Sequence, residues 1–243
     1  MFKEYMNYSD RQKKLIKFLR GKPIDTFLVR KKENITYLTG TRGEDAVLFV
    51  SPKKAVLATD SRYEKEYKNS ARKCSVRITK NKNLNEIVLE VCNETRSKII
   101  GFEADNFTYQ GYINLKKSLG KIKLTPFINA VENLRMIKDR EEIQYIRQAC
   151  ENGTRLMNYA VMAAKPGITE NSVKRKIESH ALKNSFGKSG FDIIVASGRN
   201  ASMPHAASSD KIIRKQEMVM IDLGTMHCGY NSDLTRTVFL GRI

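Results

Sequence analysis

The chain contains 243 residues, which is enough to bury a sizeable core in one or two domains. Its hydrophobic content of 41% is typical of a globular protein and argues against disorder, and no apolar run approaches the length of a membrane span. The net charge is +18, and the lysines are spread along many segments rather than gathered beside aromatic or arginine-rich elements. We therefore expect a solvated basic surface, no specific nucleic-acid partner and no membrane association.

The first residues and the cysteines bear on the location of the protein. Residues 1–7 lack an apolar segment followed by a small-residue cleavage site, which predicts a protein that is not exported. The four cysteines, Cys74, Cys92, Cys150 and Cys228, lie far apart and show no CxxC spacing. This pattern is typical of free thiols in a reducing compartment, and we expect a cytoplasmic location.

Short apolar strands alternate with helices over residues 1–130, which predicts an α/β domain. The expected strands are residues 26–29, 46–50, 55–58, 76–79 and 99–102. The expected helices begin at a Ser9-Asp10 cap and near residues 62, 84 and 109. Residues 34–39 favour a strand or a turn. Residues 126–134 are expected to form the linker to a second domain.

The pattern changes over residues 131–243. Asp139 is expected to open a long amphipathic helix that ends at Lys165-Pro166-Gly167, and Thr169 is expected to cap a second helix. The remaining expected elements are a strand over residues 191–196, a polar loop over 198–209 and a closing hairpin with strands near 218–221 and 238–240.

The closing hairpin brings two acidic residues together. If a two-residue turn falls at His227-Cys228, Asp222 lies directly opposite Asp233, with Cβ atoms roughly 5 Å apart. Two like charges in this arrangement destabilise a hairpin, whereas a divalent cation between the carboxylates reverses the sign of the interaction. The pair therefore predicts part of a metal site. The alternative is that Asp222 is only a turn residue.

Three histidines and Asp60 are the other candidates for chemistry. His205 lies on the polar loop just ahead of the hairpin and is expected to approach the aspartates, although a surface histidine is the equal alternative. His180 is expected to be an ordinary helix residue, and His227 to point away from the carboxylates. Asp60 is expected to cap the helix that follows it. A hydrolytic metal centre needs more ligands than two aspartates, and most other acidic residues of this half lie on its helices.

Several segments together resemble the Xaa-Pro aminopeptidase/prolidase group of pita-bread metallopeptidases. The matching segments are Ile194–Ala201, Pro204-His205, Ile221–Thr237, Asn34–Gly40, Thr59–Tyr63 and Leu134–Ile143. The resemblance implies an α/β N-terminal domain of the creatinase, ribonuclease H-like type with a mixed sheet over residues 1–130. It implies an incomplete α+β pita-bread domain, the N-terminal half of the catalytic domain, over residues 131–243.

The resemblance also implies a function. The family contains metal-dependent exopeptidases, and we expect an Xaa-Pro aminopeptidase that removes the residue before a proline. Asp222 and Asp233 correspond to ligands of two divalent metal ions, manganese first and cobalt or zinc as alternatives, with Asp233 bridging them. His205 corresponds to a residue that contacts the substrate and helps to stabilise the tetrahedral intermediate. The expected partners are a peptide with proline at its second position and further copies of the chain in a homo-oligomer.

The remaining metal ligands of the family, one His and two Glu, have no counterpart in this sequence. We therefore expect a truncated portion of such an enzyme, inactive alone, that associates with itself or with a complementary fragment. Two alternatives stay open. One is a non-catalytic pseudo-peptidase that serves as a binding module, and the other is a different hydrolase of the same fold, such as a prolidase or a creatinase-like enzyme.

Overall fold

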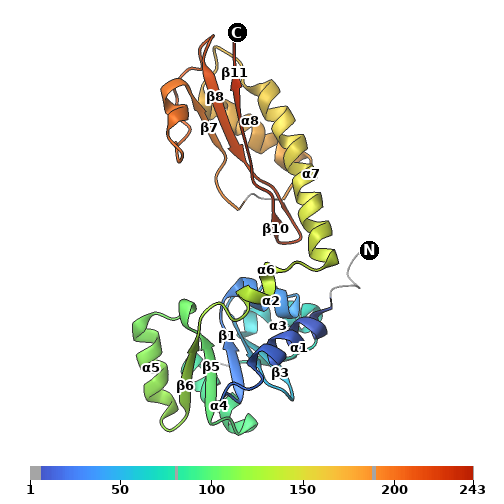
Figure 1. Cartoon of the computed structure of the whole chain (residues 1–243), viewed down its shortest axis with the longest axis vertical. Helices are drawn as coiled ribbons and strands as arrows, with labels where there is room; N and C mark the ends of the chain where they lie inside the picture. The colour runs from blue at the N-terminus through green and yellow to red at the C-terminus, as the bar shows by residue number, and fades with distance from the viewer. Residues whose placement is uncertain (1–6, 80–81, 188–189, 243) are drawn as a thin grey trace. The chain divides into compact units, whose positions relative to one another are not determined.

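The computed structural model describes residues 7–79, 82–187 and 190–242. The chain divides into two compact units, Met1–Ile137 and Lys138–Ile243 (Figure 1). The sequence placed the boundary after residue 130, whereas the division falls after Ile137. The reason is that a short helix, α6 (Glu132–Met136), packs against the first unit, where Arg135 donates a hydrogen bond to Asn34.

A six-stranded mixed sheet forms the centre of the first unit, in the order β4-β3-β2-β1-β5-β6. Strand β2 runs antiparallel to both of its neighbours, and the other pairs are parallel. The mixed sheet was expected from the sequence. Its strands are β1 (Thr26–Val29), β2 (Ala46–Val50), β3 (Ala55–Thr59), β4 (Ser75–Ile78), β5 (Ile99–Glu103) and β6 (Lys123–Phe127).

Helices cover both faces of this sheet, because its central strand is apolar on both sides. Phe27 and Val29 of β1 belong to one core cluster with side chains of α1, α2 and α3, and Leu28 belongs to a second cluster with side chains of α4 and α5. The helices are α1 (Tyr8–Leu19), α2 (Lys32–Thr39), α3 (Glu64–Ser70), α4 (Leu84–Thr95) and α5 (Tyr109–Leu119), with 3₁₀ turns η1 (Ser61–Tyr63) and η2 (Ala104–Asn106).

Two expectations for the first unit, at residues 34–39 and at Pro126, were wrong. Residues 34–39 are helical, within α2, because Glu103 of β5 accepts hydrogen bonds from the backbone N–H groups of Arg30 and Lys31 just ahead of the helix. Pro126 lies in a strand, β6, rather than in a linker. Because β6 is the edge strand of the sheet, a residue without an N–H group is tolerated there.

The second unit packs two helices against one face of a three-stranded antiparallel sheet of order β11-β8-β7. As expected, Asp139 and Thr169 cap the helices, and Asp139 does so in a capping box with Glu142. The elements are α7 (Arg140–Ala163), α8 (Glu170–Lys183), β7 (Ile194–Ser197), η3 (Gly198–Ser202), β8 (Met218–Leu223), β9 (Met226–His227), β10 (Tyr230–Asn231) and β11 (Leu234–Phe239).

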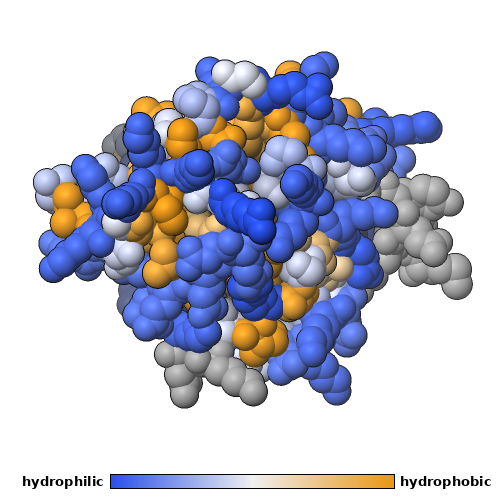
Figure 2. All heavy atoms as spheres, turned by 90° about the horizontal axis from the view of Figure 1, so that it is seen from below, coloured by the Kyte–Doolittle hydropathy of each residue, from blue (hydrophilic) through white to orange (hydrophobic). Residues whose placement is uncertain are grey.

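Polar and charged side chains cover most of the face of the molecule that is seen from below, with apolar side chains scattered between them (Figure 2). Among the described residues, no helix combines the length and the apolar character that a membrane crossing requires. The four cysteines are free thiols in the structure, and Cys150 and Cys228 are exposed.

Candidate metal site and the loop that carries His205

Strand β8 presents its two faces to different surroundings. Val219, Ile221 and Leu223 are fully buried against α7 and α8, and Met218 and Asp222 alternate with them on the other face. A strand with this alternation has one face in the core and one face turned away from it. Asp222 therefore lies on the face of the sheet that the helices do not cover, and its carboxylate is half-buried there.

The expected pairing of Asp222 with Asp233 was wrong. Asp222 lies opposite Thr235, and Leu223 lies opposite Leu234, so that Asp233 immediately precedes the paired residues of β11. The two aspartates are diagonal rather than direct neighbours, and both lie on the uncovered face, because Asp233 and Thr235 are two residues apart. Diagonal residues of an antiparallel pair are roughly 7–8 Å apart at the backbone, a separation that side chains and a cation can span.

The shift in register has a cause in the turn. The turn residues are Cys228 and Gly229, because His227 pairs with Tyr230, and both turn residues have positive φ, 49° and 85°. Two positive φ values are typical of a type I′ hairpin, in which glycine is favoured at the second position. The turn expected at His227-Cys228 would have placed two residues with side chains in the left-handed region, whereas the observed turn places Gly229 there.

Helix α7 fixes the hairpin just ahead of Asp233. Thr225 and Ser232 form a reciprocal pair, in which Ser232 N donates to Thr225 O at 2.8 Å and Thr225 N donates to Ser232 Oγ at 3.0 Å. Thr225 Oγ1 also donates to the carbonyl of Ala149 in α7 at 2.8 Å. This close approach requires Gly153, because a Cβ atom at that position would lie 2.7 Å from Ser232 Oγ. The position of Asp233 is thus set by Ser232, the buried residue that directly precedes it.

The donor chemistry of the two aspartates fits a divalent cation in part. Asp222 Oδ1 accepts a hydrogen bond from Thr235 Oγ1 at 2.8 Å, which orients the carboxylate and leaves Oδ2 without a bond to Thr235. Carboxylate oxygens suit hard divalent cations such as manganese. Within the described parts of the chain, no group of three or more His, Cys, Asp or Glu side chains could hold a metal ion. The two aspartates are therefore an incomplete ligand set.

His205 is exposed in a turn at residues 203–206, where Ala206 N donates to Met203 O. The loop that carries it returns alongside β7, because Val195 N donates to Ser208 Oγ at 2.8 Å. Strand β7 is the direct neighbour of β8, with Ile194 opposite Asp222. His205 thus lies on a segment that runs beside the strand next to Asp222.

Sequence reasoning missed the residue that shapes this loop. Glu170, the first residue of α8, is fully buried, and its carboxylate accepts hydrogen bonds from both the N–H and the hydroxyl of Ser197 and of Ser209. Asn200 also donates to it. Desolvation by burial favours the neutral acid, but these donors outweigh it and lower the pKa of Glu170. An acidic residue directly after a Thr cap, with serines flanking a polar loop, was the available signal.

A second, partly buried contact holds the start of the same loop. Lys211 Nζ donates to Ser197 Oγ at 2.8 Å and to Glu217 Oε1 at 2.6 Å. Glu217 packs against Gly198, where φ is +52° and a Cβ atom would lie 2.2 Å from Glu217 Oε1. Gly198 is therefore required both by its backbone conformation and by the approach of Glu217.

The other candidates, His180, His227 and Asp60, make local contacts with neighbouring residues. His180 of α8 stacks on Tyr159 of α7 with ring centroids 3.8 Å apart. His227 contacts the ring of Tyr145 at 5.8 Å, next to the turn rather than at its tip. Asp60 accepts a hydrogen bond from Arg62 N at 2.8 Å and caps η1, as expected from the sequence.

Comparison with known proteins identifies both units. The family model for the creatinase/prolidase N-terminal domain matches residues 11–137, and the model for metallopeptidase family M24 matches residues 144–243. The architecture is that of a two-domain metallopeptidase. The chain belongs to the creatinase/prolidase group of M24-type metallopeptidases, and the expected fold, a creatinase-type domain followed by pita-bread structure, is confirmed.

Individual relatives agree with this family. The chain is 31% identical over 242 residues to a Xaa-Pro dipeptidase of Pyrococcus furiosus, covering 96% of this chain and 65% of that protein. It is 32% identical over 219 residues to the uncharacterized peptidase YqhT of Bacillus subtilis, covering 90% and 62%. The chain thus spans less than two thirds of the length of these curated relatives.

Solved structures give the same result. A Xaa-Pro dipeptidase from Bacillus anthracis superposes with a TM-score of 0.90 at 28% identity, covering 97% of this chain and 66% of that one. An X-Pro aminopeptidase from Thermotoga maritima superposes with a TM-score of 0.85, also at 28% identity, covering 96% and 66%. The proteins that this chain is similar to thus include dipeptidases as well as an aminopeptidase.

Proposed function

We propose that this protein is a metal-dependent peptidase that cleaves the bond preceding proline, and that dipeptides of the Xaa-Pro type are its substrates. The single observation that supports this most is the placement of two acidic residues, Asp222 and Asp233, on the uncovered face of a helix-backed sheet in a chain of the M24 family. The dipeptidase assignment is favoured over the aminopeptidase expected from the sequence, because the named curated relatives of high similarity include Xaa-Pro dipeptidases from two Pyrococcus species.

In this proposal each residue has a distinct role. Asp222 and Asp233 would contribute to holding two divalent metal ions, and Thr235 orients Asp222. A bound divalent metal supplies a Lewis acid that polarises a carbonyl group and lowers the pKa of water. His205 contacts the substrate and donates a hydrogen bond toward the charge that develops on the carbonyl oxygen. Glu170 positions the loop that carries His205. Manganese is the proposed metal, with cobalt or zinc as alternatives.

The experiment that tests the proposal measures two properties of the protein. The first is binding of manganese by calorimetry, for the unchanged protein and for Asp222→Asn. The matched control is Asp210→Asn, because Asp210 is exposed and accepts a hydrogen bond from Asn171. We expect Asp222→Asn to weaken manganese binding by at least about tenfold, and Asp210→Asn to leave it unchanged.

The second property is hydrolysis of an Xaa-Pro dipeptide compared with an Xaa-Pro tripeptide in the presence of manganese, measured on the protein together with the complementary fragment that supplies the remaining metal ligands. Faster release from the dipeptide supports the dipeptidase, and faster release from the tripeptide replaces it by the aminopeptidase. Manganese binding that depends on Asp222, without hydrolysis of either peptide by the completed protein, would contradict the peptidase and favour the non-catalytic binding module.

Self-association is also part of the proposal. Met218 and Phe239 lie opposite each other on β8 and β11 and expose 57% and 38% of their surface. An apolar cross-strand pair on an uncovered face is a candidate for contact with a further copy of the chain. The cytoplasmic location expected from the sequence stays a prediction.

A further inference from the structure

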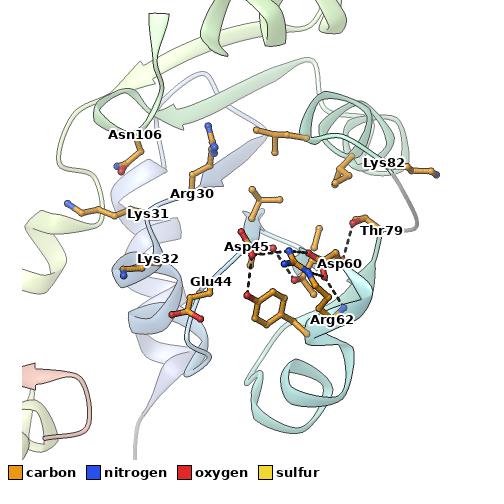
Figure 3. A pocket seen from close by; sticks show the side chains of 18 of the residues that line it. Arg30, Lys31, Lys32, Glu44, Asp45, Asp60, Arg62, Thr79, Lys82 and Asn106 are labelled. Carbon is orange, nitrogen blue, oxygen red and sulfur yellow. Dashed lines mark hydrogen bonds and ion pairs between the residues drawn. The ribbon is translucent and has the colours of Figure 1, made fainter. Parts of the chain in front are cut away.

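The first unit contains a pocket of about 800 Å³ at the end of its sheet where β1 and β3 terminate (Figure 3). The residues that follow β1 and β3, Arg30 and Asp60, line it, together with Asp45, which directly precedes β2. The carboxyl ends of the parallel strands β3 and β4 lie at this end of the sheet, as does the carboxyl end of β1. Small molecules bind preferentially at this position in open α/β sheets, and the volume lies in the range of ligand pockets.

Arg30 has an unusual environment in one wall of this pocket. Its guanidinium lies over the ring of Phe107, 4.7 Å from the centroid, and it forms no ion pair with the described residues. Burial lowers the pKa of Arg30, and the carboxylate of Glu103 opposes this effect. Glu103 itself is engaged by the backbone N–H groups of Arg30 and Lys31. The planar face of Arg30 is thus stacked, while its N–H groups remain available for a carboxylate.

The facing wall carries negative charge. Arg62 bonds to Asp45 at 3.0 Å and to Asp60 at 2.7 Å, so one cation is shared by two carboxylates. Tyr63 donates a further hydrogen bond to Asp45 at 3.1 Å. Figure 3 shows Arg30, Lys31 and Lys32 on one side of the pocket, with Glu44 next to Lys32, and Asp45, Asp60 and Arg62 on the other. Lys82 also lies on the side of Asp60, and its ammonium group pairs with Glu90. The pocket therefore has one basic and one acidic wall.

The two walls restrict the ligand. Strand β2 lies between β1 and β3, so the strand ends that carry Arg30 and Asp60 are roughly 10 Å apart. A simple anion is attracted by one wall and repelled by the other, and the same holds for a simple cation. A small molecule with a carboxylate at one end and an ammonium group at the other interacts favourably with both walls.

We propose that this pocket binds a small zwitterion, a free amino acid or short peptide, with its carboxylate on Arg30 and its ammonium group toward Asp45 and Asp60. The site lies within the first unit and uses none of the residues of the candidate metal site. The proposal therefore stands or fails independently of the peptidase function.

The experiment titrates the protein, with a chelator present, with five probes while the amide signals of Gly43 and Ala46 are followed by NMR. The probes are L-alanine, L-alanyl-L-alanine, N-acetyl-L-alanine, L-alaninamide and inorganic phosphate. We expect alanine or dialanine to bind. We expect the two blocked compounds, each of which lacks one charge, and phosphate to bind at least about tenfold more weakly than the better zwitterion.

Variants assign the contacts. Arg30→Gln is expected to weaken binding of the zwitterion by at least about tenfold. The matched control is Arg20→Gln, at an exposed arginine outside the pocket, which should leave affinity unchanged. Asp45→Asn keeps a residue type that tolerates the positive φ of 45° and should weaken the zwitterion but not N-acetyl-L-alanine. Asp222→Asn should have no effect.

Several outcomes would overturn the proposal. These are binding of none of the probes, binding of phosphate or N-acetyl-L-alanine as tight as that of the better zwitterion, and unchanged affinity in Arg30→Gln. A thermal melt of Arg30→Gln shows whether the variant is folded. If it is not, the Asp45→Asn result decides, because an unchanged affinity for the zwitterion in that variant contradicts the acidic wall.

Discussion

The hydroxyl of Thr235 donates a hydrogen bond of 2.8 Å to Oδ1 of Asp222, directly across the β8–β11 pair. A neighbour that fixes one oxygen of a ligating carboxylate orients the other, and loss of such a neighbour commonly costs 10–100-fold in metal affinity. Thr235 is thus a positioning residue for the proposed metal site.

Thr235→Val removes the hydroxyl and keeps the shape of a β-branched side chain. We expect it to weaken manganese binding by about tenfold, at the lower end of the range for such neighbours, because the carboxylate of Asp222 itself remains. Calorimetric titration measures the effect. The control is Thr237→Val, at a residue of the same strand and face that lies opposite Met220. Equal affinities of the two variants would contradict the role of Thr235.

Gly153 provides a test of how helix α7 places the hairpin. Alanine in a helix interior is ordinarily more stable than glycine by roughly 0.5–1 kcal/mol. Here the new Cβ atom would lie 2.7 Å from Ser232 Oγ, which is itself bonded to Thr225. We expect Gly153→Ala to lower the free energy of unfolding by about 1–3 kcal/mol, the usual cost of overpacking. Urea denaturation measures it.

The control for this prediction is a double-mutant cycle with Ser232→Ala. Removal of the Ser232 hydroxyl leaves only its Cβ atom, 3.5 Å from the new methyl group, at ordinary contact distance. The two substitutions should therefore be less costly together than the sum of their separate effects. Strict additivity would mean that the contact between Gly153 and Ser232 does not decide the result.

Glu170 is expected to be the most sensitive acidic residue of the second unit. Glu170→Gln introduces an amide N–H₂ group where a carboxylate oxygen accepts from Ser209 or Ser197, so buried donors lose their partner. Hydrogen bonds to charged groups contribute about 1.5–3 kcal/mol each, and we expect a loss of about 2–3 kcal/mol in unfolding free energy. The control is Glu178→Gln, at an exposed residue of the same helix. Similar losses in both variants would refute the prediction.

The contributions of the two buried glutamates, Glu170 and Glu103, to the free energy of unfolding should change with pH in opposite directions. Hydrogen bonds lower the pKa of Glu170, so its contribution to stability is present above the ordinary pKa of Glu and is lost as the pH falls through the folded-state value. Desolvation raises the pKa of Glu103 despite its bonds to Asn34 and to backbone N–H groups. Its contribution is therefore full below the ordinary pKa of Glu and is lost as the pH rises through the raised value.

Glu103→Gln tests the second half of this statement, because the amide does not titrate. As the pH falls through the raised pKa of Glu103 toward the ordinary pKa of Glu, the unchanged protein should gain stability from this residue, and the variant should lack this part of the gain. Urea denaturation of the first unit at each pH measures it, with the exposed Glu33→Gln as control. A variant that follows the same pH profile as the unchanged protein would contradict the prediction.

The sequence predicted the elements of both units well where local signals were strong. The apolar runs at Thr26–Val29 and Ala46–Val50 form strands with those bounds, and the caps at Asp139 and Thr169 begin helices as expected. The failures were at residues 34–39 and at β6, where the decisive partners are far away in the chain. Glu103 stabilises the start of α2 from another strand, and β6 is defined by its pairing with β5. Local propensity carries no information on either contact.

The candidate site was predicted in its residues and not in its geometry. The pattern around Asp222 and Asp233 was sufficient to select both, but their register depended on one turn. The positive φ values of Cys228 and Gly229 place the turn one residue later than expected. The partner of Asp222 therefore moves by two residues, from Asp233 to Thr235. The role of Glu170 was missed because the four hydrogen bonds that it accepts from Ser197 and Ser209 join segments that lie far apart in the sequence.

The apolar pair on the uncovered face of the second sheet gives the last prediction. Met218 and Phe239 lie opposite each other at the end of β8 and β11, on the same face as Asp222, and both are exposed. Phe239→Thr keeps a residue with high β propensity and removes most of the apolar area, so it should shift the protein toward the monomer without loss of thermal stability. Analytical ultracentrifugation over a range of concentrations measures this, with Tyr109→Thr as control, because Tyr109 is 80% exposed at the start of α5 in the first unit. A monomeric unchanged protein, or equal association of the two variants, would exclude this face as the contact.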